Sequence, residues 1–560
     1  MADNHKVIRD QTGQEMVEAM QEIAEAIRTG GFSGSVLAAL LNEDNYAAVM
    51  KAWFASKGAA AMADFTDLCE EWYALTRTGW SGGVRFQIPA SGAAANSDGS
   101  KTGDNYGMSC TPSTTSVKNQ DDYASVPLFF PIDCNVELDA NGDPHIKGID
   151  GICGSFARTD PAKIVCVMQM TGWVRFVVDN TVALYGWDYT DAPMKDGFRP
   201  LPEAVSLYDN SVRSFVVHGK YSFGPNWSCC SGQKSMIWTV SHNSQLTGVQ
   251  SQWGTRYCGA TSADDAFMKL MLYLKYARLD TDRILHGCNN YNYEYQPAVA
   301  ETGVERIILT TAQGANLIVG STVVLAASKR SASNVVDRCR ITQIVTVSID
   351  GTNYSAIYVD NGGTTFNTTT DMWLSTIAWH TGSTDDVLGN DGGIDPTSDR
   401  YPVKIQGIEY MLGFYEVMGD VILSYGSQDS VNKCIPNVCR DATKLSTSVT
   451  SDYAAGTGAP TGSSAAWQYP KQMRSRMDLL ELIFPYDIGG STSGGPRDGF
   501  YLLIVTSGVY EWLRFGLLYN GVGTAGLSCG YGGYGLGSAI WTVGGRLSVT
   551  GNRGEFQAAA

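Results

Sequence analysis

Residues 526–548 read GLSCGYGGYGLGSAIWTVGGRLS, and the chain has no Asp, Glu, Lys or Arg from Phe515 to Gly545. Gly, Leu and Tyr are the commonest residues of the stretch, which also contains Ser and Trp541. Tyr and Trp offer large, rigid contact areas at small entropic cost, and Ser and Gly adapt around them, as in antibody paratopes. In a chain of net charge −16, this composition favours a binding surface made of uncharged side chains.

The composition of the whole chain indicates a globular protein. Of its 560 residues, 44% are hydrophobic and 17% are charged, which suffices for a large core and roughly two to four domains. The excess of 56 acidic over 40 basic residues argues against nucleic acid and anionic membranes as partners. The start, MADNHKVIRDQTGQ, is polar, and no apolar run reaches the length of about 18 residues that a membrane span needs. We therefore expect synthesis in a cytoplasm without membrane insertion.

Cysteine and histidine give no sign of a metal or catalytic centre. The 13 cysteines are scattered and read as buried thiols rather than as a disulfide framework. Cys434 and Cys439 lack the CxxC spacing, and the six histidines form neither a cluster nor an HExxH motif. GxSxG and P-loop motifs are also missing, so we expect no catalytic residues and no cofactor.

Residues 1–85 have the pattern of a small helical module. Thr12 and Glu15 form a capping box, and the apolar residues that follow them recur at helical spacing up to Gly30-Gly31. This spacing suits either an oligomer seam or a face packed within a small bundle. Two further helices are expected at 36–56 and 64–76, for attachment to a larger particle or for oligomerisation. Residues 86–119 are rich in Gly, Ser and Asn and read as an extended connection.

Two styles of sequence then alternate. Residues 120–298 hold strand-like, aromatic segments and one strong helix, which Ser262 and Asp265 are expected to cap. Residues 299–400 hold short β-branched runs with a hairpin-turn signal at Asp350-Gly351, which predicts an antiparallel β-module. The aromatic style returns at 401–560. We therefore expect one α+β domain, formed by 120–298 and 401–560, that is interrupted by the β-module.

The last part of the β-module is a Gly- and Asp-rich loop. Its carboxylates and amide could bind calcium, but they lack the EF-hand spacing, so a plain solvated loop is favoured. The weak metal candidates are Asp385, Asp386, Asn390 and Asp391.

Three segments together resemble a known family. They are residues 274–295, LKYARLDTDRILHGCNNYNYEY, residues 404–421, KIQGIEYMLGFYEVMGDV, and residues 512–556, which contain GGRLS followed by GNRGEF. In this order they resemble the phage receptor-binding proteins that retroelements diversify. The variable domains of that family have the C-type lectin fold, in the branch related to formylglycine-generating enzymes. The resemblance covers 120–298 and 401–560.

The resemblance implies an origin for the uncharged stretch. In such systems adenines of a template repeat are miscopied into the gene, so that AAY codons become codons for Tyr, Ser, Gly, Leu and others without creating stops. A variable region of about 508–548 is implied, on a frame of Asn520-Gly521, Ala525 to Leu527, Ala539, Trp541 and Gly544 to Ser548. The expected receptor contacts are Tyr510, Trp512, Phe515, Leu518, Tyr519, Val522, Thr524, Ser528, Tyr531, Tyr534, Ser538, Ile540 and Thr542.

Several of these residues have a structural alternative. Phe515, Leu518 and Ile540 could equally be core, because alternate apolar residues of a strand usually face inward. Trp541 is expected to be structural, and Cys529 could be a variable position or a buried thiol. The glycines of the stretch, Gly516, Gly523, Gly532 and Gly533, are expected to provide positive φ in turns. Glu409 and Glu416 are expected to be structural, and any of the buried acids to accept hydrogen bonds from backbone amides.

The departures from related folds narrow the function. The EPN, QPD and WND motifs of calcium-dependent sugar-binding lectins are missing, and Cys529 has no partner cysteine near it, as formylglycine-type catalysis would require. The leading hypothesis is a virion adhesin at the tail or baseplate, which binds a bacterial surface receptor and contacts other virion proteins, as a homotrimer. The alternatives are a structural virion protein of the tail, neck or capsid, and a lectin-fold enzyme.

Overall fold

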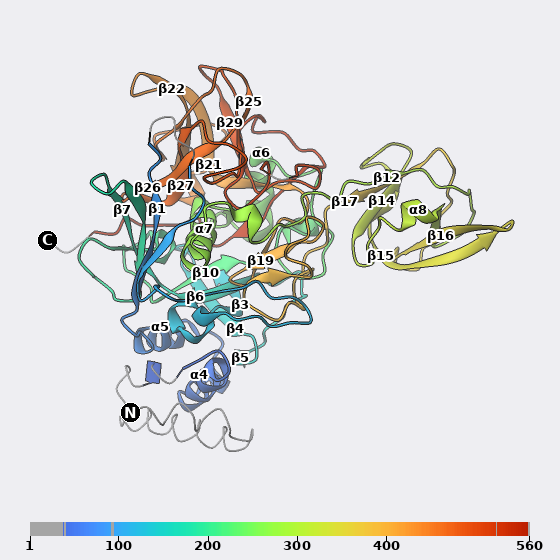
Figure 1. Ribbon diagram of the computed structural model, residues 1–560. Coiled ribbons are helices and arrows are strands. Elements are labelled where there is room, and N and C mark those ends of the chain that lie inside the picture. The colour runs from blue at the N-terminus through green and yellow to red at the C-terminus, as the bar shows by residue number, and fades with distance from the viewer. Residues whose placement is uncertain (1–36, 39–40, 91–94, 522, 558–560) are drawn as a thin grey trace.

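The computed structural model describes residues 37–38, 41–90, 95–521 and 523–557 of an α+β protein made mostly of antiparallel sheets. The helix expected between Thr12 and Gly30 lies outside these residues. The described helices are α4 (Tyr46–Ser56), α5 (Thr66–Leu75), α6 (His242–Trp253), α7 (Ser262–Tyr276) and the short α8 (Thr311–Gly314). Figure 1 shows one large body with a smaller β-module that projects from its side.

Helices α4 and α5 pack on the large body and share its main hydrophobic core. The Nε1 group of Trp72 donates to the hydroxyl of Tyr46 at 2.9 Å and so joins the two helices. The single helix expected at 36–56 is interrupted, because residues 37 and 38 are helical, residues 43–45 form a turn, and α4 begins at Tyr46. The carbonyl of the Asn42 side chain accepts from the backbone N–H groups of Asp44 and Asn45, which favours a turn over a helix there.

Two five-stranded sheets form the base of the large body. The first has the order β2-β1-β8-β7-β9 and the second β10-β6-β3-β4-β5. Their bounds are β1 (Ser81–Gln87), β2 (Ser100–Gly103), β7 (Trp173–Asp179), β8 (Leu184–Thr190), β9 (Arg199–Pro200), and β3 (Ile132–Leu138), β4 (Pro144–Ile149), β5 (Cys153–Gly154), β6 (Val165–Met170), β10 (Phe215–Gly219). Strand β1 pairs with β8 along its whole length. The segment expected as a connection therefore begins within a sheet strand.

Helix α7 lies at the centre of the large body (Figure 1), and its residues from Ser262 to Lys275 are all buried. The expected cap is wrong by one residue. The Thr261 hydroxyl accepts from the Asp264 N–H, and the Asp264 carboxylate accepts from the Thr261 N–H. Ser262 instead donates its N–H and hydroxyl to Asp420, because the strand that carries Asp420 passes beside the start of the helix.

The projecting β-module contains a six-stranded sheet of order β12-β17-β14-β15-β16-β13 with a core of its own. Asp350 and Gly351 have φ of 50° and 78° and join β15 to β16, with Ile349 opposite Thr352, so the expected hairpin turn is confirmed. The strands are β12 (Glu294–Tyr295), β13 (Arg306–Thr310), β14 (Thr322–Ala326), β15 (Asn334–Ile349), β16 (Thr352–Val359) and β17 (Trp373–Ile377). Residues after Ile377 return to the large body, where Trp379 packs with Leu412 and Phe414.

A nine-stranded sheet carries the C-terminal part of the chain. Its main path is β23-β22-β21-β29-β30-β28-β25, while β24 pairs with β22 and β31 with β21. The bounds are β21 (Tyr415–Gln428), β22 (Val431–Cys439), β23 (Tyr453–Ala455), β24 (Ala459–Pro460), β25 (Ala466–Gln468), β28 (Phe500–Leu502), β29 (Val509–Arg514), β30 (Gly530–Tyr531) and β31 (Val543–Gly544). The uncharged stretch thus supplies β30, at the centre of this sheet, and β31.

Small pairings complete the body. They are the hairpin of β26 (Pro470–Arg476) and β27 (Leu479–Ile488), the three-stranded sheet of β18 (Gly392–Gly393), β19 (Val403–Ile405) and β20 (Ile408–Tyr410), and the pair of β11 (Cys258–Gly259) with β32 (Leu547–Ser548). The last pair fixes the GGRLS segment beside the start of α7.

Candidate binding surface

A buried ionic cluster holds the two ends of the uncharged stretch. Arg514 precedes the stretch and Arg546 follows it, and both pair with Glu416 of β21, at 3.0 Å and 2.9 Å. Arg546 also donates to the backbone carbonyls of Gly219 and Lys220 at 2.9 Å and 2.8 Å. Burial would raise the pKa of Glu416, but the two guanidinium groups lower it, so the carboxylate stays charged.

The GGRLS and GNRGEF segments continue this cluster at the start of α7. Asp264 accepts from the Ser548 hydroxyl at 2.7 Å and contacts Nδ1 of His218 at 2.9 Å. Arg553 pairs with Asp420 at 2.7 Å. Because breaking a buried ion pair costs about 3–5 kcal/mol, these contacts fix the path of the chain on either side of the uncharged stretch.

An aromatic cluster lies between these fixed ends. We define it as Trp467, Tyr501, Tyr519, Tyr531, Tyr534 and Trp541, which are all half-buried or exposed. The rings of Tyr501 and Tyr531 stack with their centroids 4.6 Å apart, and Tyr534 lies 4.7 Å from Tyr531. At the other end, the rings of Tyr519 and Trp541 are 5.8 Å apart. Partial burial raises the pKa of Tyr519, and the charge that Tyr534 would carry when ionised adds to this rise.

The backbone sets the spacing of the rings. Strands β28 and β30 run parallel with Tyr501 opposite Tyr531, and the Gly532 N–H donates to the Tyr501 carbonyl at 3.0 Å. A Cβ on Gly533 would lie 2.9 Å from Cε1 of Tyr531 and 3.0 Å from Cε1 of Tyr501. Positive φ was expected at four glycines. Gly523 has it, but Gly516, Gly532 and Gly533 do not, so the expectation is wrong for these three. Gly533 is required because the stacked rings occupy the space beside it.

The expected contact residues divide by exposure. Tyr519 and Ile540 are exposed, by 49% and 38%. The half-buried ones are Tyr510, Thr524, Tyr531, Tyr534 and Ser538. Val522 lies outside the described residues. The rings of Tyr531 and Tyr534 contact each other, and that of Tyr519 contacts Trp541. Tyr510 packs instead against Tyr425 at a ring distance of 5.3 Å.

Five of the expected contacts are wrong as surface residues. They are the buried side chains Trp512, Phe515, Leu518, Ser528 and Thr542. Trp512 packs on Phe484, and the hydroxyl of Ser528 lies 2.7 Å from that of Tyr273 on α7. In each case the alternation of the strand or the tight turn directs the side chain into the core, where it can touch no partner. Phe515 also has φ of 77°, and the Arg514 guanidinium lies 4.4 Å from its ring.

Sequence reasoning missed several neighbours of the cluster. Trp467 and Tyr501 come from β25 and β28, and only the parallel pairing with β30 reveals their role. Arg330 of the projecting β-module lies 4.4 Å above the Trp541 ring and pairs with Glu294. In the sequence, only the alternation of residues 500–502 indicated that Tyr501 faces outward. No sequence pattern indicated that the β-module contacts the cluster.

The candidate calcium ligands do not converge. Asp385 accepts from the hydroxyls of Tyr221 and Ser231 at 2.5 Å and 2.6 Å, while Asp386 is exposed. Asp391 is buried, so the expectation of a plain solvated loop is wrong for it. Within the described residues one group, Cys110, Asp121 and Asp391, has metal-ligand spacing.

In that group a lysine ammonium supplies the positive charge. Nζ of Lys275 lies 2.9 Å from Asp121 and 2.7 Å from Asp391. Glu409, from the GIEY segment, accepts from the backbone N–H groups of Gly382 and Thr384, both at 3.0 Å, which confirms its expected structural role.

Comparison of the chain with protein-family models finds no match, and comparison with curated proteins finds none either. Across the described ranges, every helix is too short or too polar to span a bilayer. The assignment of the surface therefore rests on its geometry. Partly exposed rings with hydroxyls, with the paired Arg330 over one of them, are suited to binding by apolar contact, ring stacking and neutral hydrogen bonds.

Proposed function

We propose that the chain is a phage virion adhesin that binds a bacterial surface receptor through the aromatic cluster, on a C-type-lectin-like domain diversified by a retroelement. The observation that carries the proposal is a partly exposed aromatic surface held at both ends by buried ion pairs. An uncharged, partly exposed set of rings is contributed by the stretch after Phe515, and buried ion pairs of Arg514 and Arg546 hold both ends of that stretch.

The arrangement supports a change of partner without a change of fold. The side chain of Tyr519 can be replaced with little effect on the core, because it is 49% exposed and its ring contact is with the half-buried Trp541. Tyr531 and Tyr534 are half-buried and also pack against the main core, so their replacement changes the edge of the core as well. The segments that resemble the phage family support the same proposal, because their residues Glu416, Arg546 and Arg553 all belong to the buried ionic cluster. Several copies on one particle would convert weak single contacts into avidity.

Binding to whole cells tests the proposal. Fluorescently labelled full chain is measured by flow cytometry on a panel of cultured bacteria, beside the variants Tyr519→Ala and Tyr534→Ala. Tyr208→Ala is the matched control, because Tyr208 is 73% exposed and lies outside the cluster. We expect binding to a few strains, a loss of about 2 kcal/mol or more in the two cluster variants, and no change in the control.

Two results would contradict the proposal. Equal binding of the cluster variants and the control would place the contact elsewhere on the chain. Failure to bind any strain, even when the chain is multimerised on beads, would favour a structural role in the virion.

A further inference from the structure

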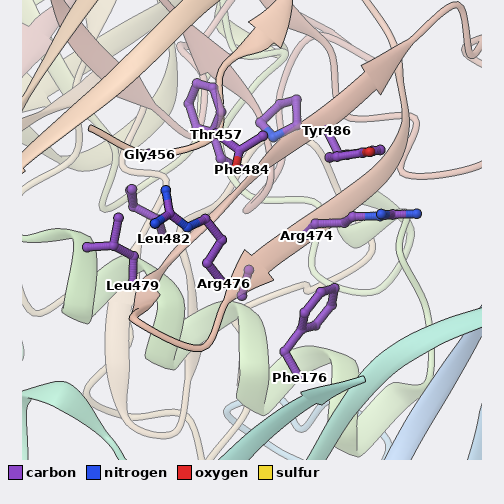
Figure 2. A pocket seen from close by; sticks show the side chains of 11 residues that line it. Phe176, Gly456, Thr457, Arg474, Arg476, Leu479, Leu482, Phe484 and Tyr486 are labelled. Carbon is purple, nitrogen blue, oxygen red and sulfur yellow. The ribbon is translucent and has the colours of Figure 1, made fainter. Parts of the chain in front are cut away.

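A pocket lies against the β26–β27 hairpin, outside the aromatic cluster. It has a volume of about 190 Å³ and is lined by this hairpin, by Gly456 and Thr457, and by Phe176 of β7. Figure 2 shows Leu479 and Leu482 on one side of it and Tyr486 with Arg474 on the other. None of its lining residues belongs to the aromatic cluster.

Most of the wall is apolar. Leu479, Leu482 and Phe484 are buried side chains of β27 that still border the pocket, and Phe176 faces them from another sheet. A cavity of about 150 Å³ with such a lining holds a benzene molecule. The pocket is therefore large enough for one ring with a short substituent.

The wall also carries an unbalanced positive charge. The guanidinium of Arg474 stacks on Tyr486, 3.8 Å from the ring centroid, and donates from Nε and Nη2 to the neutral side-chain carbonyl of Gln472 at 3.0 Å and 2.6 Å. No carboxylate of the described residues pairs with it. Arg476, on the same strand, differs because it pairs with Asp478.

We propose that this pocket binds a small carboxylate on a ring-sized, mainly apolar body. The ring lies against Leu479, Leu482 and Phe484, and the carboxylate accepts from Arg474. Arg474 has no ion pair with a described carboxylate and lies beside an apolar wall, so an anionic ligand would balance its charge. Aromatic acids and sugar acids both carry this chemistry, and the walls favour the former.

Binding of benzoate to the full chain tests this, with benzyl alcohol as the neutral probe and glucuronate as the sugar-acid probe. Saturation-transfer NMR or calorimetry gives the dissociation constants. We expect benzoate to bind about tenfold more tightly than benzyl alcohol, because a hydrogen bond to a charged group adds that much. Tighter binding of glucuronate than of benzoate would support a sugar-acid ligand in the same pocket.

Two variants separate the contribution of the Arg474 charge to binding from an effect of the substitution on folding. Arg474→Gln should remove the preference for benzoate, and Lys471→Gln, a charge-removing control on the same strand outside the pocket lining, should leave it within about twofold. Arg474→Lys keeps the charge and should keep part of the preference if Arg474→Gln fails to fold. The proposal is overturned if the parent chain binds neither benzoate nor glucuronate at about 10 mM, or if the preference for the anion survives Arg474→Gln.

Discussion

Two glycines of the uncharged stretch, only two residues apart, offer a sharp test of how the aromatic cluster is held. In Gly533→Ala the new methyl group would lie 2.9 Å from a ring carbon of Tyr531, closer than Cβ atoms approach, and 3.0 Å from one of Tyr501, a tight contact. The rings must shift apart, and such overpacking costs about 1–3 kcal/mol. In Gly535→Ala the new methyl group would meet no described atom within 4 Å, and the residue does not have positive φ. This control should be neutral or slightly stabilising.

Hydrogen exchange of the peptides that contain 500–503 and 530–533 is the suitable assay, because it reports local opening of the β28–β30 pairing. A cost of about 1.4 kcal/mol corresponds to about tenfold faster exchange. We expect that increase in Gly533→Ala and less than a twofold change in Gly535→Ala. Equal exchange in the two variants would refute the idea that ring packing sets the geometry of the cluster.

Three further predictions concern the frame. Burial alone would lower the pKa of His218, but Asp264 and a second buried carboxylate raise it to about 9. The resulting stabilisation, about 3 kcal/mol, is complete below pH 6.5 and is lost as the pH rises to 9. His218→Gln should flatten the fall of the thermal midpoint over this pH range. Arg546→Met leaves Glu416 without one of its two buried partners and should cost about 3–5 kcal/mol or abolish soluble expression; a midpoint equal to the parent's would contradict this. Gly351→Val places a β-branched residue at φ of 78° and should cost about 1–2 kcal/mol, seen as faster exchange confined to residues 341–359.

Local chemistry made part of the fold predictable. The Asp350-Gly351 turn follows from residues that tolerate positive φ, and the main strands follow from alternating or β-branched runs. Helix α7 was found with its cap shifted by one residue, because Thr261-Ser262 and Asp264-Asp265 offer two equivalent capping boxes to the sequence. Only the approach of Asp420 to Ser262 decides between them, and that contact spans more than a hundred residues of chain.

The surface was harder to predict than the fold. Strand β30 has two residues, so no alternation could show that Ser528 points inward and Tyr531 outward. Arg514 reads as a surface charge in the sequence, yet it is fully buried because Glu416 and Asp265 neutralise it. Tyr531 and Tyr534 have glycines beside them that cannot build a core, yet both are half-buried, because their rings pack against the main core.

The most direct test of the central claim is the DNA sequence that follows this gene. Diversification predicts a near-copy of the codons for roughly residues 505–550, with differences at template adenines and a reverse-transcriptase gene nearby. The variable codons should include those of the exposed positions, such as Tyr519, Tyr531 and Tyr534, and should spare Arg514 and Arg546. No such copy in the genome, or differences that fall on the two arginines, would contradict a variable surface carried on a fixed frame.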